Sequence, residues 1–251
     1  MSNTNAVKRA RGTRWCKTGI GFAVIAVIAF VIGLGGARIG LLPPMGAFSG
    51  FGIGLLCAIL SALTTAIGIV ISMGTAGDAS AARSWGALAV SVMIVATVLS
   101  QRPGTSGAPP INDISTDTNN PPAFQAIVPL RADVPDYPGE EFAALQHKHF
   151  PDLVTLKIDK PIGEVFAATE QIARDSGWDI VDTDRAAGRI EATVRTPWIQ
   201  FEDDVVIRLV ESGSVTHVDM RSKSRLGRGD MGVNAKRIRN FLDKLKSQVA
   251  A

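Results

Sequence analysis

Three long runs without a charged residue constrain this chain more than any other feature of its sequence. Residues 18–37, 39–77 and 84–101 contain neither acid nor base, and a helix needs about 20 apolar residues to cross a bilayer. We therefore predict three membrane spans, at residues 18–37, 48–73 and 84–101, with Pro43 and Pro44 in the loop before the second. Residues 1–101 would form a membrane anchor.

The charges beside these runs predict the orientation of the anchor. Five basic residues lie between Lys8 and Lys17, and basic segments stay in the cytoplasm. Three crossings of the inner (plasma) membrane then place the C-terminal part outside the cytoplasm. A cleaved signal peptide is the alternative for the first span, although its apolar run exceeds the usual stretch of about 7 to 15 residues. Gly50 and Gly54 predict close helix packing, within the chain or between two copies.

The distribution of charge argues against nucleic acid as a partner. Residues 1–100 hold seven basic residues and one acid, whereas the remainder holds 19 basic residues and 22 acids. The basic excess therefore belongs to the membrane half, and the soluble half lacks the positive field that binds nucleic acid. The spans themselves carry no charge, which favours an anchor over an ion path.

The second half of the sequence predicts a small α+β domain. Residues 102–124 are rich in Pro, Gly, Ser, Thr and Asn and predict an extended linker or strap before a domain at 125–251. A short helix is expected after Pro138. Strands are predicted at residues 153–158, 178–184, 189–196, 203–210 and 215–224, with a helix after the first strand and another after the last. The expected fold is β-α-β-β-β-β-α, an antiparallel sheet with two helices on one face.

Alternation gives this sheet two chemically different faces. Apolar residues such as Ile190, Ile207 and Met220 would face the helices. The opposite face carries both signs of charge: Arg189, Glu191, Arg195, Asp204, Arg208, Asp219, Arg221, Lys223 and Arg225. We interpret it as a solvated sheet with cross-strand ion pairs, and the alternative is a docking platform for an anion, a membrane or a protein.

The glycine-rich loop at residues 226–234 is the best candidate for a ligand site. It leads into a helix N-terminus, where free N–H groups favour anions. Asp230 as a helix cap and Asn234 bonded to the end of the strand form the simpler interpretation. The candidate ligand-binding residues are Arg221, Arg225, Arg228, Asp230 and Asn234. No catalytic set, metal site or cofactor is predicted, and His147 and His149 are interpreted as a solvated helix end.

Several stretches resemble the domain of unknown function 1499 family. They are INDISTDTNNPPAF at 111–124, GWDIVDTDRAAGRIEATVRTPW at 177–198, FEDDVVIRL at 201–209 and VDMRSKSRLGRGDMGVNAKRIRNFL at 218–242. The resemblance covers about residues 111–247 and implies an exported or membrane-tethered domain, without an established activity. Matching positions include Asp113, Thr116, Asp117, Arg208 and Asp219, whereas Ile199 and Gln200 depart from the Phe-Gly pair of similar sequences.

Three functions follow as hypotheses. The first is an integral membrane protein whose extracytoplasmic domain binds an envelope protein or an anionic lipid or glycan, without catalysis. The second is an envelope hydrolase or transferase that uses Asp117, Asp203 or Asp219 beside the arginines. The third is a scaffold that assembles a membrane complex through its spans.

Overall fold

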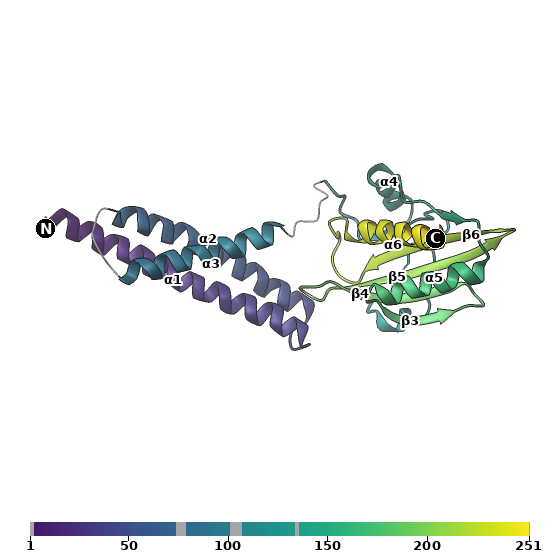
Figure 1. The fold of residues 1–251 in the computed structure, drawn as a ribbon, viewed down its shortest axis with the longest axis horizontal. Helices are drawn as coiled ribbons and strands as arrows, with labels where there is room; N and C mark the ends of the chain where they lie inside the picture. The colour runs from purple at the N-terminus through teal and green to yellow at the C-terminus, as the bar shows by residue number, and fades with distance from the viewer. Residues whose placement is uncertain (1–2, 74–78, 101–106, 134–135, 251) are drawn as a thin grey trace. The chain divides into compact units, whose positions relative to one another are not determined.

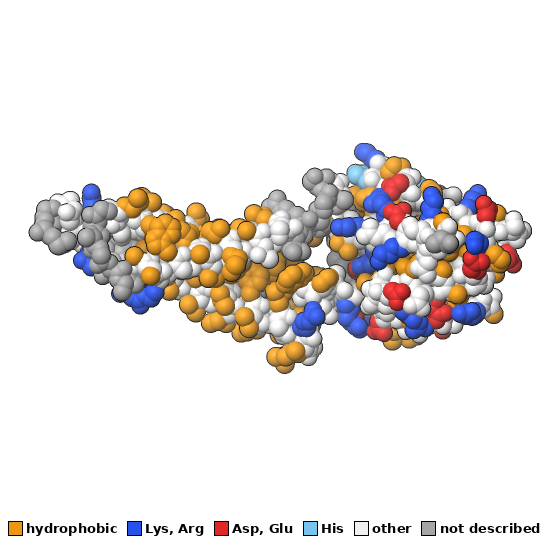
Figure 2. Space-filling model, in the orientation of Figure 1, with side chains coloured by type: hydrophobic (Ala, Val, Ile, Leu, Met, Phe, Trp, Pro, Cys, Tyr) orange, Lys and Arg blue, Asp and Glu red, His pale blue; other side chains and the backbone are white. Residues whose placement is uncertain are grey.

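The computed structural model describes residues 3–73, 79–100, 107–133 and 136–250. The chain divides into two compact units, one built from the N-terminal helices and one from a sheet with its helices, and each is described by itself. In Figure 2, hydrophobic side chains cover much of the visible surface of the helical unit, whereas charged side chains of both signs gather on the sheet unit.

The helical unit consists of α1 (Asn3–Arg38), α2 (Pro44–Ser72) and α3 (Ala79–Ser100). Each contains one predicted span and is long and apolar enough to cross a membrane. Pro43 is the N-cap of α2 and Pro44 its first residue, a position where the missing N–H of proline leaves no helical bond unmade. The predicted end of the third span, Gln101, and the first linker residues, 102–106, lie outside the described residues.

Small and hydroxylated residues hold these helices together. A Cβ added at Gly50 would lie 3.2 Å from the Cα of Gly33, and one at Gly54 would meet the ring of Phe30. Ser61 Oγ donates to the carbonyl of Gly19 at 2.8 Å, and Ser91 Oγ donates to Ser61 Oγ at 2.8 Å. The small residues of α2 thus serve packing within the chain, where they let two backbones approach closely.

The sheet unit confirms the predicted α+β class. Its order is β1-β6-β5-β4-β3, antiparallel throughout, with β2 also paired with β6. Figure 1 shows α5 and α6 on the same face of the sheet. The elements are β1 (Asp113–Ser115), η1 (Val128–Leu130), α4 (Glu140–His149), β2 (Leu156–Ile158), α5 (Ile162–Asp175), β3 (Asp179–Asp184), β4 (Arg189–Arg195), β5 (Glu202–Ser212), β6 (Val215–Ser224) and α6 (Val233–Ala250).

The core lies between the sheet and the pair α5 and α6, as the alternation predicts. Apolar side chains of alternate strand positions meet one stripe of each helix, and each removes apolar area from water worth about 25 cal/mol per Å². Trp178 stacks on Phe241 of α6, with ring centroids 4.9 Å apart. The buried cluster includes Val165, Phe166, Ile172, Ile190, Val205, Ile207, Leu209, Val218, Met220, Ile238, Phe241 and Leu245.

Two features differ from the expectation. β1 lies in the predicted extended linker or strap, where no strand was expected, but it pairs with β6 beside β2, so that both share the outer edge of β6. The central part of the charged face is also not solvated. Glu191 and Asp204 are fully buried there, and Arg221 is 3% exposed. The interpretation of an open sheet with surface ion pairs is therefore wrong for its central strands.

Candidate functional site

An extended segment, residues 111–131, covers the charged face, and we call it the strap. It starts as β1 on the edge of β6 and reaches β4, where the Glu191 carboxylate accepts the backbone N–H groups of Gln125, Ala126 and Ile127 at 2.9, 3.2 and 3.0 Å. Phe124 and Ile127 pack on Val206 of β5 in a second buried cluster. The strap thus supplies both the apolar cover and the hydrogen-bond donors that a buried carboxylate needs.

Arg221 lies at the centre of the covered face. Its Nε and Nη2 donate to the two oxygens of Asp113 at 2.9 and 2.8 Å, and Lys223 Nζ donates to the same carboxylate at 3.1 Å. The guanidinium carbon lies over the rings of Phe124 and Tyr137, 4.9 and 5.4 Å from their centroids. This bidentate pairing with aromatic contacts on the guanidinium is a site for which arginine is specifically suited.

Asp204 is a second centre of buried charge. It accepts Arg131 Nη1 from the strap at 2.6 Å, Arg225 Nε at 2.8 Å and the hydroxyl of Thr193 at 2.9 Å. Hydrogen bonding to Asp204 raises the pKa of Arg225. Arg225 also donates to Glu202, so its charge is satisfied within the domain.

A third cluster joins the strap to β5 and β6 through Arg208. Its Nη2 lies 2.9 Å from Asp117 Oδ2 and 2.9 Å from Asp219 Oδ2. Asp219 Oδ1 also accepts the hydroxyls of Thr116 at 3.0 Å and Thr155 at 2.6 Å. The structure therefore brings Asp117 and Asp219 together, whereas Asp203 points to the helical face and pairs with Arg237.

The loop between β6 and α6 follows the simpler prediction. Asp230 caps α6: its carboxylate accepts the N–H groups of Gly232 at 2.8 Å and Asn234 at 2.6 Å. Burial raises the pKa of the Asp230 carboxyl, and the nearby Asp203 adds to the rise. Asn234 is fully buried, accepts Ser222 Oγ at 2.6 Å and donates to Ser224 Oγ at 2.9 Å. Because Asp230 already occupies the N-terminus of α6, that terminus offers less to an external anion.

The five predicted ligand-binding residues thus have different surroundings. Arg221, Arg225 and Asn234 bond to other parts of the domain, and Asp230 caps the helix. Arg228 is exposed at the tip of the loop, between Leu226, 47% exposed, and Met231, 65% exposed. Ligand binding by these residues stays a prediction. Of the five, Arg228 at the loop tip is the one that is exposed.

The loop is held firmly to the start of the strap. Asn112 Nδ2 donates to the carbonyl of Gly227 at 2.6 Å. A Cβ added at Gly229 would lie 3.0 Å from the Cα of Pro110, so glycine is needed there for the close approach of two backbones. These contacts fix the backbone at the base of the loop, from which the loop tip projects.

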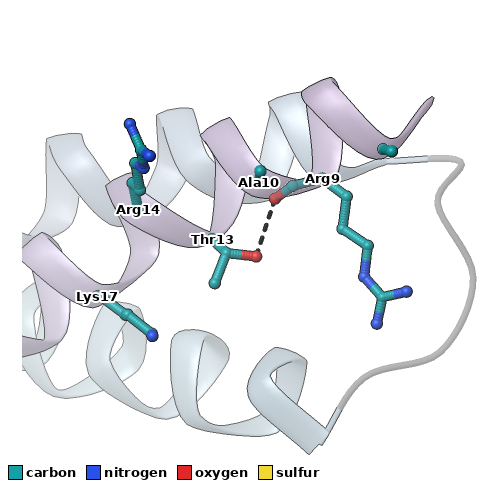
Figure 3. A pocket seen from close by; sticks show the side chains of 6 residues that line it. Arg9, Ala10, Thr13, Arg14 and Lys17 are labelled. Carbon is teal, nitrogen blue, oxygen red and sulfur yellow. Dashed lines mark hydrogen bonds between the residues drawn. The ribbon is translucent and has the colours of Figure 1, made fainter. Parts of the chain in front are cut away.

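In the helical unit, three basic residues are among the six that line a hollow on α1. Its lining is Ala6, Arg9, Ala10, Thr13, Arg14 and Lys17. Figure 3 shows these side chains along successive turns, with Thr13 Oγ1 donating to the carbonyl of Arg9 at 2.9 Å. Such a surface suits the anionic headgroups of a membrane leaflet. Among the described residues, no group of three or more His, Cys, Asp or Glu side chains is arranged to hold a metal ion.

The fold and its buried network define a class: apolar helices that could span a membrane, followed by an α+β domain whose antiparallel sheet is covered by helices on one face and by a charged strap on the other. A family model described as "Protein of unknown function (DUF1499)" matches residues 113–245. The chain belongs to the DUF1499 family. A search of curated proteins gave no match.

Proposed function

We propose that the protein is a membrane-anchored binding protein of the cell envelope. In this proposal α1 to α3 cross the inner (plasma) membrane, the N-terminus is cytoplasmic, and the sheet domain lies outside the cytoplasm. The domain binds an envelope component, either a protein or an anionic lipid or glycan, at the loop between β6 and α6, and it does so without catalysis.

The dimensions of α1 support this orientation. A helix of 36 residues is about 54 Å long, whereas the hydrocarbon core of a bilayer is about 30 Å thick. The excess corresponds to the basic turns that contain Arg9, Arg14 and Lys17. Basic residues next to a span favour the cytoplasmic side, and three crossings then lead to the opposite side.

The observation that carries the binding proposal is the contrast between the buried charges of the sheet and the exposed Arg228 of the loop. Arg221, Asp204 and Glu191 are buried under the strap, where each has partners within the domain. Arg228 is left exposed on a loop with a fixed base. A rigid loop with an exposed cation and apolar neighbours is a common form of binding surface.

The enzymatic alternative has less support. It requires Asp117, Asp203 or Asp219 to act as a general acid, a general base or a nucleophile. Each of the three carboxylates is instead ion-paired with an arginine of the same domain, Arg208 or Arg237. Their arrangement resembles that of structural ion pairs.

Site-specific photo-cross-linking in the native membrane tests the binding proposal. A photoreactive amino acid replaces Arg228 in the full-length protein, and the matched control replaces Lys244, which is exposed on α6. We expect a cross-linked envelope component from position 228 and none from position 244. The absence of a product at 228, or the same product from both positions, would overturn the proposal.

Labelling with a membrane-impermeant maleimide tests the orientation. In a background with Cys16→Ser and Cys57→Ser, single cysteines are introduced as Asn5→Cys and Lys244→Cys. On spheroplasts or whole cells with a permeable outer layer, we expect label at position 244 and label at position 5 only after lysis. The reverse pattern would contradict the proposed topology.

A further inference from the structure

We infer that the loop between β6 and α6 and the turn between β4 and β5 dock together on the anionic surface of the bilayer in which the protein is anchored. This inference rests on the proposed function, because it names the lipid headgroup region as the component that the loop binds.

Strand register places the two segments at the same end of the sheet. Arg195 pairs with Glu202 across the β4–β5 turn, and Asp203 pairs with Ser224, the last residue of β6. The Arg225 N–H continues this ladder by donating to the Glu202 carbonyl at 3.0 Å. Residues 197–200 and 226–232 therefore both project beyond one end of the sheet.

The side chains at this end combine apolar and basic character. Trp198, Leu226 and Met231 are 48%, 47% and 65% exposed, and tryptophan is enriched at the interface between membrane and water. Arg228 and Lys236 add exposed positive charge, which an anionic leaflet attracts. The carboxylate of Asp230 points back to the N–H groups of α6 and leaves this basic character little opposed.

A short linker joins α3 to the segment that lies against this loop. Nine residues, and therefore ten Cα–Cα steps, join Ser100, the end of α3, to Pro110, which lies against Gly229 of the loop. They span at most about 35 Å even when fully extended. This is about the length of β6, whose ten residues rise about 33 Å. A linker of this length allows the loop end of the sheet to reach the surface of the bilayer.

Spin labels on the full-length protein in nanodiscs test the docking. In the background with Cys16→Ser and Cys57→Ser, a nitroxide is attached at Leu226→Cys or at Val210→Cys. Val210 is a matched control because it is 48% exposed and lies near the opposite end of β5. Relaxation of each label by a nickel-chelating lipid reports its proximity to the headgroups.

In nanodiscs that contain phosphatidylglycerol, we expect relaxation of the label at 226 to exceed that at 210 at least threefold. The added substitutions Trp198→Ala and Arg228→Ala should reduce this ratio toward one, and uncharged phosphatidylcholine should reduce it partly. Equal relaxation at the two sites would overturn the docking. If position 228 still cross-links to a soluble glycan or an envelope protein, only the lipid assignment fails, and if it gives no product, the proposed function fails as well.

Discussion

At the scale of single residues, the charged side chains of the sheet are part of the fold. A buried ion pair contributes little net stability in itself, but the loss of one partner leaves an uncompensated charge in the interior. Arg221 and Asp113 form such a pair, with side chains 3% and 0% exposed. By contrast, Arg239 and Asp152 form a pair with side chains 38% and 51% exposed.

These two pairs allow a matched comparison. We expect Asp113→Asn to lower the free energy of unfolding by about 3–5 kcal/mol, because Arg221 and Lys223 lose their shared anion. Asp152→Asn should lower it by about 0–1 kcal/mol. Denaturant unfolding of the detergent-solubilised protein, followed by tryptophan fluorescence, measures both. Equal effects of the two substitutions would contradict a buried network.

Tyr137 provides a second test at this scale, because it is the only tyrosine in the chain. Burial, followed by the charge of Asp113, raises its pKa to about 12, and its hydroxyl has no hydrogen-bond partner among the described residues. A raised pKa contributes stability that is complete below the ordinary pKa of about 10 and is lost as the pH rises through about 12.

The tyrosinate absorbance near 295 nm reports this titration directly. We expect a midpoint near 12 in the folded protein and near the ordinary value of about 10 after unfolding. Tyr137→Phe should remove the corresponding loss of stability at high pH, and at neutral pH it should be neutral or stabilising. A midpoint of about 10 in the folded state would place this ring in water.

At the scale of elements, the sequence predicts the strands and helices well, and it predicts an extended linker or strap at residues 102–124, but not the pairing of β1 with β6. β6 begins and ends where alternation predicts it. β1 contains a single apolar residue, Ile114, between Asp113 and Ser115, so its burial depends on partners more than 100 residues away. Such long-range pairing leaves no local periodicity, and the segment has the composition of a linker.

The sequence nevertheless contains one signal that this segment covers the charged face of the sheet. The charged face carries six cations and three acids, and Asp113 and Asp117 of the linker supply further carboxylates. An excess of cations on a sheet face, with acids in a segment of irregular structure nearby, indicates a cover. The capping role of Asp230 was predictable from the loop itself, because a cap is a local interaction.

The turn between β3 and β4 gives a prediction at this scale. Gly188 has φ of +64°, and a Cβ there would lie 2.3 Å from the carbonyl oxygen of Leu209. Gly213, in the β5–β6 turn, has φ of +67° with open space around it. Gly213→Ala should lower the free energy of unfolding by about 1–2 kcal/mol, because alanine is strained in the left-handed region. Gly188→Ala should lower it by about 1–3 kcal/mol more, because the added Cβ also overpacks the turn. Thermal unfolding compares them, and equal costs would contradict the close approach.

At the scale of the whole molecule, the two halves have different chemistry and different tasks in this account. The helices pack through small residues and have an apolar surface compatible with a membrane. The sheet domain pairs the charges beneath the strap internally, and in the proposal one loop end makes the contact. The location of the domain and its ligand belong to the proposal, because the fold and the family describe neither.

The most direct test of the account is amide hydrogen exchange on the full-length protein in nanodiscs with and without anionic lipid. We predict slow exchange at Gln125, Ala126 and Ile127, whose N–H groups are bound by Glu191, with both lipids. Residues 226–231 should exchange faster and gain protection only with anionic lipid. Exchange of the strap amides at the rate of an unstructured chain would leave the charged face open and contradict the central claim.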